Sequence, residues 1–140
     1  MLALQDVFDM REDKLFKAAS GLSGGIGEMR DTCGALLGPC LMLGMVYGRG
    51  RDELENQEKM NESYIPVAKL YKWFEKEYGS TTCKEIITRH GNGVYYDATV
   101  PWQRKLAREA GVFKKDNDLV GRSAARAAEM IWDALHQEEE

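Results

Sequence analysis

Two cysteines of this 140-residue chain stand where a helix is predicted to begin. Cys33 follows a glycine-rich stretch, residues 21–27, and opens the apolar run Cys-Gly-Ala-Leu-Leu-Gly. Cys83 lies between Thr82 and Glu85, which have the spacing of a capping box. Unpaired N–H groups and the helix dipole at such a position stabilise a thiolate. The pair therefore predicts thiol, disulfide or metal–sulfur chemistry.

The third cysteine, Cys40, lies two helical turns after Cys33 and on the same helix face. The two residues are expected about 10 Å apart along the axis, too far for a disulfide within one helix. Its apolar neighbours favour a core position, although a three-thiolate metal site of Cys33, Cys83 and Cys40 stays open. An odd number of cysteines, 3, is a poor disulfide framework and fits a reducing compartment.

The net charge, the hydropathy and two missing motifs argue against several classes of protein. The net charge is −4 and the pI about 5.3, so nucleic acid is not an expected partner. No run of 18 apolar residues occurs, so no membrane insertion is expected. The N-terminus lacks a basic leader, which predicts a cytoplasmic protein. The Cys-x-x-Cys-His sequence is absent, so covalent c-type haem is excluded.

The hydrophobic spacing predicts an all-α fold, a compact bundle of about five or six helices in a single helical domain, residues 1–140. Asp31 is predicted to cap a helix that runs to about Tyr47, and Pro39 predicts a kink in it. Pro66 is predicted to start a helix in its first turn, after a polar stretch, residues 53–63, that forms a solvated helix or an ordered loop.

The C-terminal third is predicted to hold two more helices. Pro101 opens a short one, and Asp116 or Asn117 caps the last. A short extended segment is the weaker expectation for residues 94–96. The buried stripe of the last helix is expected to consist of five apolar residues: Val120, Ala124, Ala127, Ile131 and Leu135.

The glycines predict close backbone contacts. Gly34 and Gly38 are four residues apart, and so are Gly44 and Gly48, a spacing that favours tight helix packing or the seam of a homodimer. Gly24, Gly25 and Gly34 are also the candidates for contact with a cofactor, although the turn lacks the ending of a phosphate-binding loop.

Taken together, these motifs resemble the redox-active family named for its C-GCAxxG-C-C pattern, which also occurs as a domain of split-Soret cytochromes c. The resemblance is carried by the glycine turn, by Cys-Gly-Ala-Leu-Leu-Gly at 33–38 and by Gly-Ser-Thr-Thr-Cys at 79–83. It covers about residues 2–90 well and the rest loosely. The family's first cysteine would precede Met1, so the chain is expected to be naturally short or to lack its beginning.

The resemblance implies a redox role, and a family site of four cysteines would permit an iron–sulfur cluster. Its last cysteine should fall near residues 115–118, where this chain has Asp116-Asn117-Asp118. One copy therefore cannot supply four thiolates. A three-thiolate site, a site shared across a dimer or an oxygen ligand from Asp116 remain alternatives.

Two functions follow as hypotheses. In the first, Cys33 and Cys83 cycle between dithiol and disulfide, or ligate a metal or iron–sulfur centre, in electron transfer with an unidentified redox partner protein. In the second, a member that has lost the chemistry acts as a helical interaction module, with a homodimer formed through the glycine-lined helix. A weaker third reading is a haem or small-ligand pocket near Tyr64, Tyr71 or His90.

Overall fold

The computed structural model describes residues 1–136, which form seven α-helices, two short 3-10 helices and, within that range, no strand. The all-α prediction is confirmed, with more helices than expected. The elements are α1 (Leu2–Val7), α2 (Asp13–Ala19), η1 (Ser20–Leu22), α3 (Gly34–Tyr47), η2 (Arg51–Glu53), α4 (Gln57–Tyr78), α5 (Cys83–His90), α6 (Pro101–Glu109) and α7 (Val112–His136).

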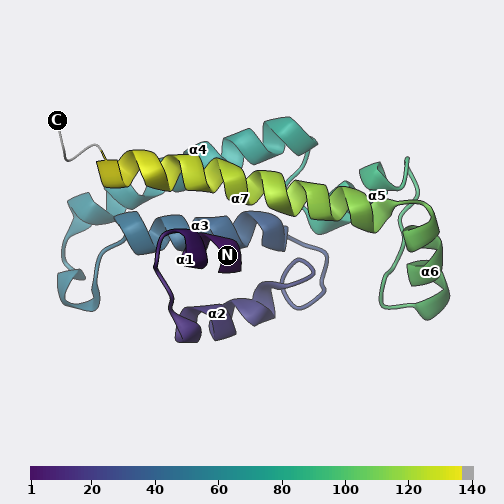
Figure 1. The fold of residues 1–140 in the computed structure, drawn as a ribbon, viewed down its shortest axis with the longest axis horizontal. Coiled ribbons are helices and arrows are strands. Elements are labelled where there is room, and N and C mark those ends of the chain that lie inside the picture. The colour runs from purple at the N-terminus through teal and green to yellow at the C-terminus, as the bar shows by residue number, and fades with distance from the viewer. Residues whose placement is uncertain (137–140) are drawn as a thin grey trace.

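The long helix α7 runs along the molecule, and α3 and α4 pack beside it (Figure 1). The short helix α1 contacts both α3 and α7, α2 lies beyond α3, and α5 and α6 gather at the end where α7 begins. None of the helices in residues 1–136 is long and apolar enough to cross a membrane. The core is formed by buried apolar side chains of five helices: Leu4, Leu36, Met42, Leu43, Leu70, Phe74, Ile86, Leu119, Ala127 and Ile131.

A hydroxyl group on α7 compensates for the proline inside α3. Pro39 has no N–H, so the carbonyl of Ala35, four residues earlier, loses its helical donor. Ser123 is fully buried, and its Oγ donates a 2.7 Å hydrogen bond to that carbonyl. The helix continues through Pro39 to Tyr47, so this proline lies within one continuous element and marks a contact with α7.

The prediction that Pro66 starts a helix is wrong. Pro66 lies inside α4, which begins nine residues earlier, after the N-cap Asn56. The Asn56 side chain accepts a 2.9 Å hydrogen bond from the N–H of Lys59 and so caps the helix. Residues 57–63 are therefore the first turns of α4. Gly79 ends the helix in the left-handed conformation, with φ 72°, as predicted.

The last helix also starts earlier than predicted. It begins at Val112, after Gly111 with φ 74°, so Asp116 lies within the helix and caps nothing. The predicted stripe is right at Ala127 and Ile131, but the exposed fractions of Val120 and Leu135 are 52% and 44%. Leu119 and Ser123 are buried instead. The buried face of α7 is the face that α3 and α5 cover. The spacing of residues in α7 alone does not specify which face that is.

Of two minor predictions for residues 94–109, one is wrong and one is confirmed. Residues 94–96 form no strand, since they lie in the loop between α5 and α6. The short helix from Pro101 is confirmed as α6, with the proline in its first turn. Several large aromatic side chains are exposed, among them Tyr71, Trp102 and Trp132.

Candidate dithiol site

A short antiparallel bridge joins the starts of α3 and α5. Thr32 pairs with Thr82, and the N–H of Cys33 donates to the carbonyl of Thr81 at 2.8 Å. In return, the N–H of Cys83 donates to the carbonyl of Asp31 at 2.7 Å. Each cysteine follows one member of the Thr pair, so both side chains leave the bridge on the same face. This pairing brings together two residues that are far apart in the sequence.

The same bridge explains why the start of α3 was misplaced. The helix begins at Gly34 and its N-cap is Cys33, two residues later than the predicted cap Asp31. The Asp31 side chain accepts a hydrogen bond from the adjacent N–H of Thr32 at 2.6 Å, and the Asp31 carbonyl is used in the bridge. Cys83, in contrast, is the first residue of α5, after the N-cap Thr82, as predicted.

All three cysteines are free thiols, and the Cys33 and Cys83 side chains lie close enough to shift each other's pKa. The hydrogen bond from Cys33 lowers the pKa of Cys83 from 9.0 to about 7, with the Gly34 N–H and the Arg30 cation acting in the same direction. Burial and the Asp116 carboxylate oppose this shift. The pKa of Cys33 is raised, first because it donates to Cys83 and then because it is buried. Cys83 is therefore the thiolate of the pair.

The two cysteines differ in solvent exposure. Cys33 is 8% exposed, whereas Cys83 is only partly buried. Both line a cavity of about 290 Å³ between the glycine turn, the starts of α3 and α5, and α7. The other lining residues are mostly apolar, with one cation and one carboxylate: Ser23, Gly24, Arg30, Gly34, Ala35, Ile86, Ile87, Asp116, Leu119 and Val120.

The glycine turn that borders this cavity is left-handed. Five consecutive residues, 24–28, have φ between 60° and 76°, and among them Ile26 and Glu28 are not glycine. Left-handed backbone is costly for such residues and is concentrated at functional sites. Gly25 is buried, and a Cβ on it would lie 2.7 Å from the backbone N and O of Asp31. The turn thus packs directly onto the segment that forms the bridge.

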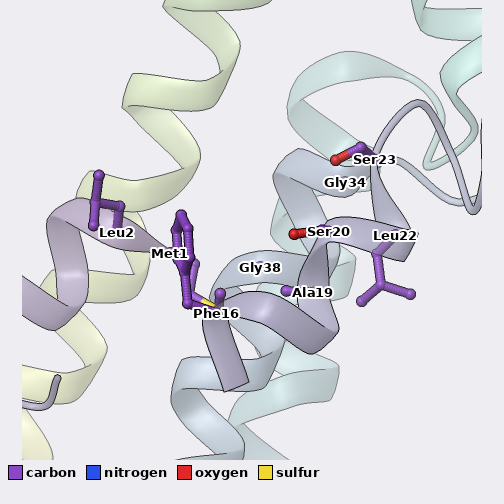
Figure 2. Close-up of a pocket in the computed structure, with 9 residues that line it drawn as sticks. All are labelled: Met1, Leu2, Phe16, Ala19, Ser20, Leu22, Ser23, Gly34 and Gly38. Atoms are coloured by element: carbon purple, nitrogen blue, oxygen red, sulfur yellow. The ribbon is translucent and has the colours of Figure 1, made fainter. Parts of the chain in front are cut away.

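The glycines of α3 contact the chain's own N-terminal segment. A Cβ on Gly34 would lie 3.3 Å from the carbonyl oxygen of Leu22, and one on Gly38 would lie 3.5 Å from Met1. Both line a second cavity of about 250 Å³, beside α2 and η1 (Figure 2). Of the cofactor candidates, Gly24 and Gly34 line the dithiol cavity, whereas Gly25 supports the turn. The glycine spacing therefore reflects packing within one chain at these positions.

Cys40 is not part of the dithiol cavity. It packs against the core cluster, and burial raises its pKa to about 11. Within residues 1–136 no group of three or more His, Cys, Asp or Glu side chains is arranged to hold a metal ion. The donor set of one chain does not fit a metal or iron–sulfur centre, because only two sulfurs converge.

The structure gives three side chains roles that the sequence did not indicate. His90, expected in a solvated loop, is the last residue of α5, and its Nδ1 lies 2.6 Å from Oδ1 of Asp116. Lys115 donates a 2.7 Å hydrogen bond to the His90 carbonyl. Arg30 lines the cavity. No local pattern signals these contacts, because each joins separate elements.

The residues of the third reading do not form one pocket. Tyr64 is exposed on α4, Tyr71 shares a 3.2 Å hydrogen bond with Thr81 Oγ1, and His90 is paired with Asp116. The Tyr71 contact instead supports Thr81, in the bridge segment that precedes Cys83.

Comparison with known proteins identifies a family for this chain. The model of one family, "Putative redox-active protein (C_GCAxxG_C_C)", matches residues 1–130. Comparison with curated proteins and with solved structures gave no match. The family match extends past the region that the sequence motifs cover well, through most of α7. The chain therefore belongs to the C_GCAxxG_C_C family of redox-active proteins.

Proposed function

We propose that this redox-active protein works by thiol–disulfide exchange, with Cys83 as the attacking thiolate and Cys33 as the resolving thiol. The observation that carries the proposal is that the Thr32–Thr82 bridge places two free thiols side by side in the lining of one cavity. A thiolate is the nucleophile in such exchange, and a pKa near ambient pH is optimal for it. The pKa of Cys83, about 7, meets this condition.

The reaction balances with an external disulfide as the oxidant. The Cys83 thiolate attacks one sulfur of the substrate, so a Cys83–substrate bond forms while the substrate S–S bond breaks and one thiolate leaves. Cys33 then loses its proton to solvent and attacks Cys83, which releases the second substrate thiolate. The products are two substrate thiols and a Cys33–Cys83 disulfide, after transfer of two electrons. An external dithiol reverses the sequence.

The protein environment helps the first step more than the second. The Gly34 N–H faces the Cys83 sulfur and stabilises its negative charge, while Cys33 supplies a further donor. Once Cys83 is in the mixed disulfide, Cys33 no longer faces a neighbouring thiolate. The factor that most raises its pKa is then removed. The order of attack is therefore set by the contact between the two sulfurs.

Serine variants test this order of attack. Cys33→Ser should accumulate a stable mixed disulfide at Cys83 with hydroxyethyl disulfide, whereas Cys83→Ser should not form one at Cys33 at a comparable rate. Cys40→Ser is the matched control, since Cys40 packs against the core away from the cavity, and it should behave as the wild type. Mass spectrometry of the intact protein gives the adducts. A mixed disulfide at Cys33 that forms as fast as that at Cys83 would overturn the assignment.

A metal or iron–sulfur centre is the alternative use of the same sulfurs. One chain supplies only two converging thiolates, so such a centre would require ligands from a second chain or partner. Metal and sulfide analysis of protein purified without oxygen separates the two proposals. Protein free of iron and sulfide supports dithiol exchange, whereas stoichiometric iron and sulfide lost in both serine variants would support the centre.

A homodimer or interaction module is the second candidate function, and we propose the Gly44 end of the glycine-lined helix as its surface. Gly34 and Gly38, at the other end, face Leu22 and Met1 of the same chain. Gly44 faces open space among the described residues, next to the exposed Met45. Light scattering at micromolar concentration tests whether this end of α3 pairs two copies.

A further inference from the structure

We infer that the disulfide substrate of this site is a small molecule bearing a carboxylate or similar anionic group, which Arg30 binds while Cys83 attacks the neighbouring sulfur. The inference rests on the proposed dithiol function and deepens it by naming the substrate class. Its basis is a guanidinium that lines the same cavity as Cys83 and has no anion to pair with at hydrogen-bond distance.

Arg30 carries a poorly compensated charge. Its side chain is 12% exposed, and its Nε and Nη2 atoms are shielded from solvent without a hydrogen-bond partner among residues 1–136. The Glu28 carboxylate lies 4.0 Å from Nη2, beyond hydrogen-bond length, and is itself 61% exposed. Shielded polar groups without partners destabilise a fold. A guanidinium retained in this state is therefore a strong attractor for an anion that enters the cavity.

The backbone holds Arg30 in register with Cys83. Its N–H donates to the Gly24 carbonyl at 3.1 Å, and its carbonyl accepts from the N–H of Lys84 at 3.0 Å. Arg30 itself has φ 63°, a conformation that non-glycine residues rarely adopt. The Arg30 backbone is thus anchored to the first turn of α5, the turn that carries the attacking sulfur. Such preorganisation reduces the entropy cost of binding.

The cavity fits a small ligand. Its volume of about 290 Å³ is at the lower end of the range of small-molecule sites. Apolar side chains, Ile86 and Leu119 among them, line the part that would receive a carbon skeleton. The guanidinium fork matches a carboxylate in geometry and charge. The one opposing charge in the lining is Asp116, whose Oδ1 is held by His90 at 2.6 Å.

Three disulfides of similar skeleton and different charge test the inference. These are dithiodipropionate, which is dianionic, hydroxyethyl disulfide, which is neutral, and cystamine, which is dicationic. The readout is the second-order rate of Cys33–Cys83 oxidation, and the ratio of the anionic to the neutral rate is compared between variants. This ratio cancels any change in the Cys83 thiolate fraction, which Arg30→Gln will reduce because Arg30 lowers the pKa of Cys83.

The wild type should prefer the dianionic over the neutral disulfide by about tenfold, the size of one charge-assisted hydrogen bond, and cystamine should be slowest. Arg30→Gln should bring the ratio close to one. Lys84→Gln is the matched control, because Lys84 adjoins Cys83 but its exposed side chain lies outside the cavity. It should keep the wild-type ratio.

An equal loss of the ratio in Lys84→Gln, or none in Arg30→Gln, would overturn the inference while leaving the dithiol proposal intact. If hydroxyethyl disulfide also fails to oxidise the pair, the dithiol proposal itself fails. The two results are therefore distinguishable in one experiment.

Discussion

At the scale of single residues, the proposed order of attack depends on the position of one proton. The Cys33 thiol donates to Cys83, so negative charge is favoured on the more accessible sulfur and disfavoured on the buried one. The helix-start placement of Cys83 already predicted a stabilised thiolate. The larger effect, however, comes from the other cysteine, and no sequence pattern indicates which of two cysteines will donate.

The pH dependence of alkylation tests this proton position. In the wild type, the rate of Cys83 alkylation by iodoacetamide should rise with a midpoint near pH 7, since its pKa is lowered to about 7. Cys33→Ala removes the main donor, so the midpoint should move upward and the rate at pH 7 should fall. Peptide mass spectrometry follows Cys83, with Cys40 as the slow internal reference because its pKa is about 11. An unchanged or lower midpoint in Cys33→Ala would contradict the account.

At the scale of elements, the site depends on backbone contacts around the Thr32–Thr82 bridge. The sequence predicted the start of α5 because Thr82 and Glu85 are local signals. It misplaced the start of α3 by two residues, since Asp31 and Cys33 pair with the segment 81–83 that lies about fifty residues away. Contacts of that range have no local signature, which is also why Arg30 was missed as a neighbour of the thiols, whereas Asp116 was considered beside them only through the family resemblance.

The glycine turn gives an element-scale prediction. Gly25→Ala places a Cβ against the Asp31 backbone at a residue with φ 76°, so it should displace the bridge and slow Cys83 alkylation at pH 7 several-fold. Gly27→Ala is the control, because φ is also positive, 60°, but the Cβ meets nothing within 4 Å among the described residues. It should cost only about 1 kcal/mol. Equal alkylation rates for Gly25→Ala and the wild type would argue against this coupling.

The contact between α3 and α7 gives a second prediction at the scale of elements. Ser123→Ala leaves the Ala35 carbonyl without a donor and should lower the free energy of unfolding by about 1–3 kcal/mol, measured with denaturant. Pro39→Ala restores a backbone N–H, so Ser123→Ala should cost less in that background. If the two substitutions are additive, Ser123 does not compensate for Pro39.

At the scale of the whole molecule, the all-α class and most helices were predictable from hydrophobic spacing and caps. The arrangement was not, because it depends on which face of α7 is covered and on helices that run through proline. Pro66 illustrates this, since the Asn56 cap and packing of the buried proline against neighbouring helices outweigh the local signal for a new start. The two cysteines lie at the starts of two helices, α3 and α5, from different halves of the chain.

This placement predicts that oxidation stabilises the protein. A Cys33–Cys83 disulfide closes a loop of about 50 residues, which in the chain-entropy model raises the free energy of unfolding by up to about 4 kcal/mol. Thermal unfolding of the oxidised form should therefore occur at a higher temperature than that of the reduced form. Cys33→Ser should show no such difference. A lower melting temperature of the oxidised wild type would mean that the disulfide distorts the bridge.

The central claim is tested most directly by equilibrating the protein in buffers of defined dithiol and disulfide ratio and identifying cysteine pairs by peptide mass spectrometry. The account predicts a single two-electron transition in which Cys33 becomes linked to Cys83 while Cys40 stays free. Absence of this link at every potential, or a link that includes Cys40, would contradict it.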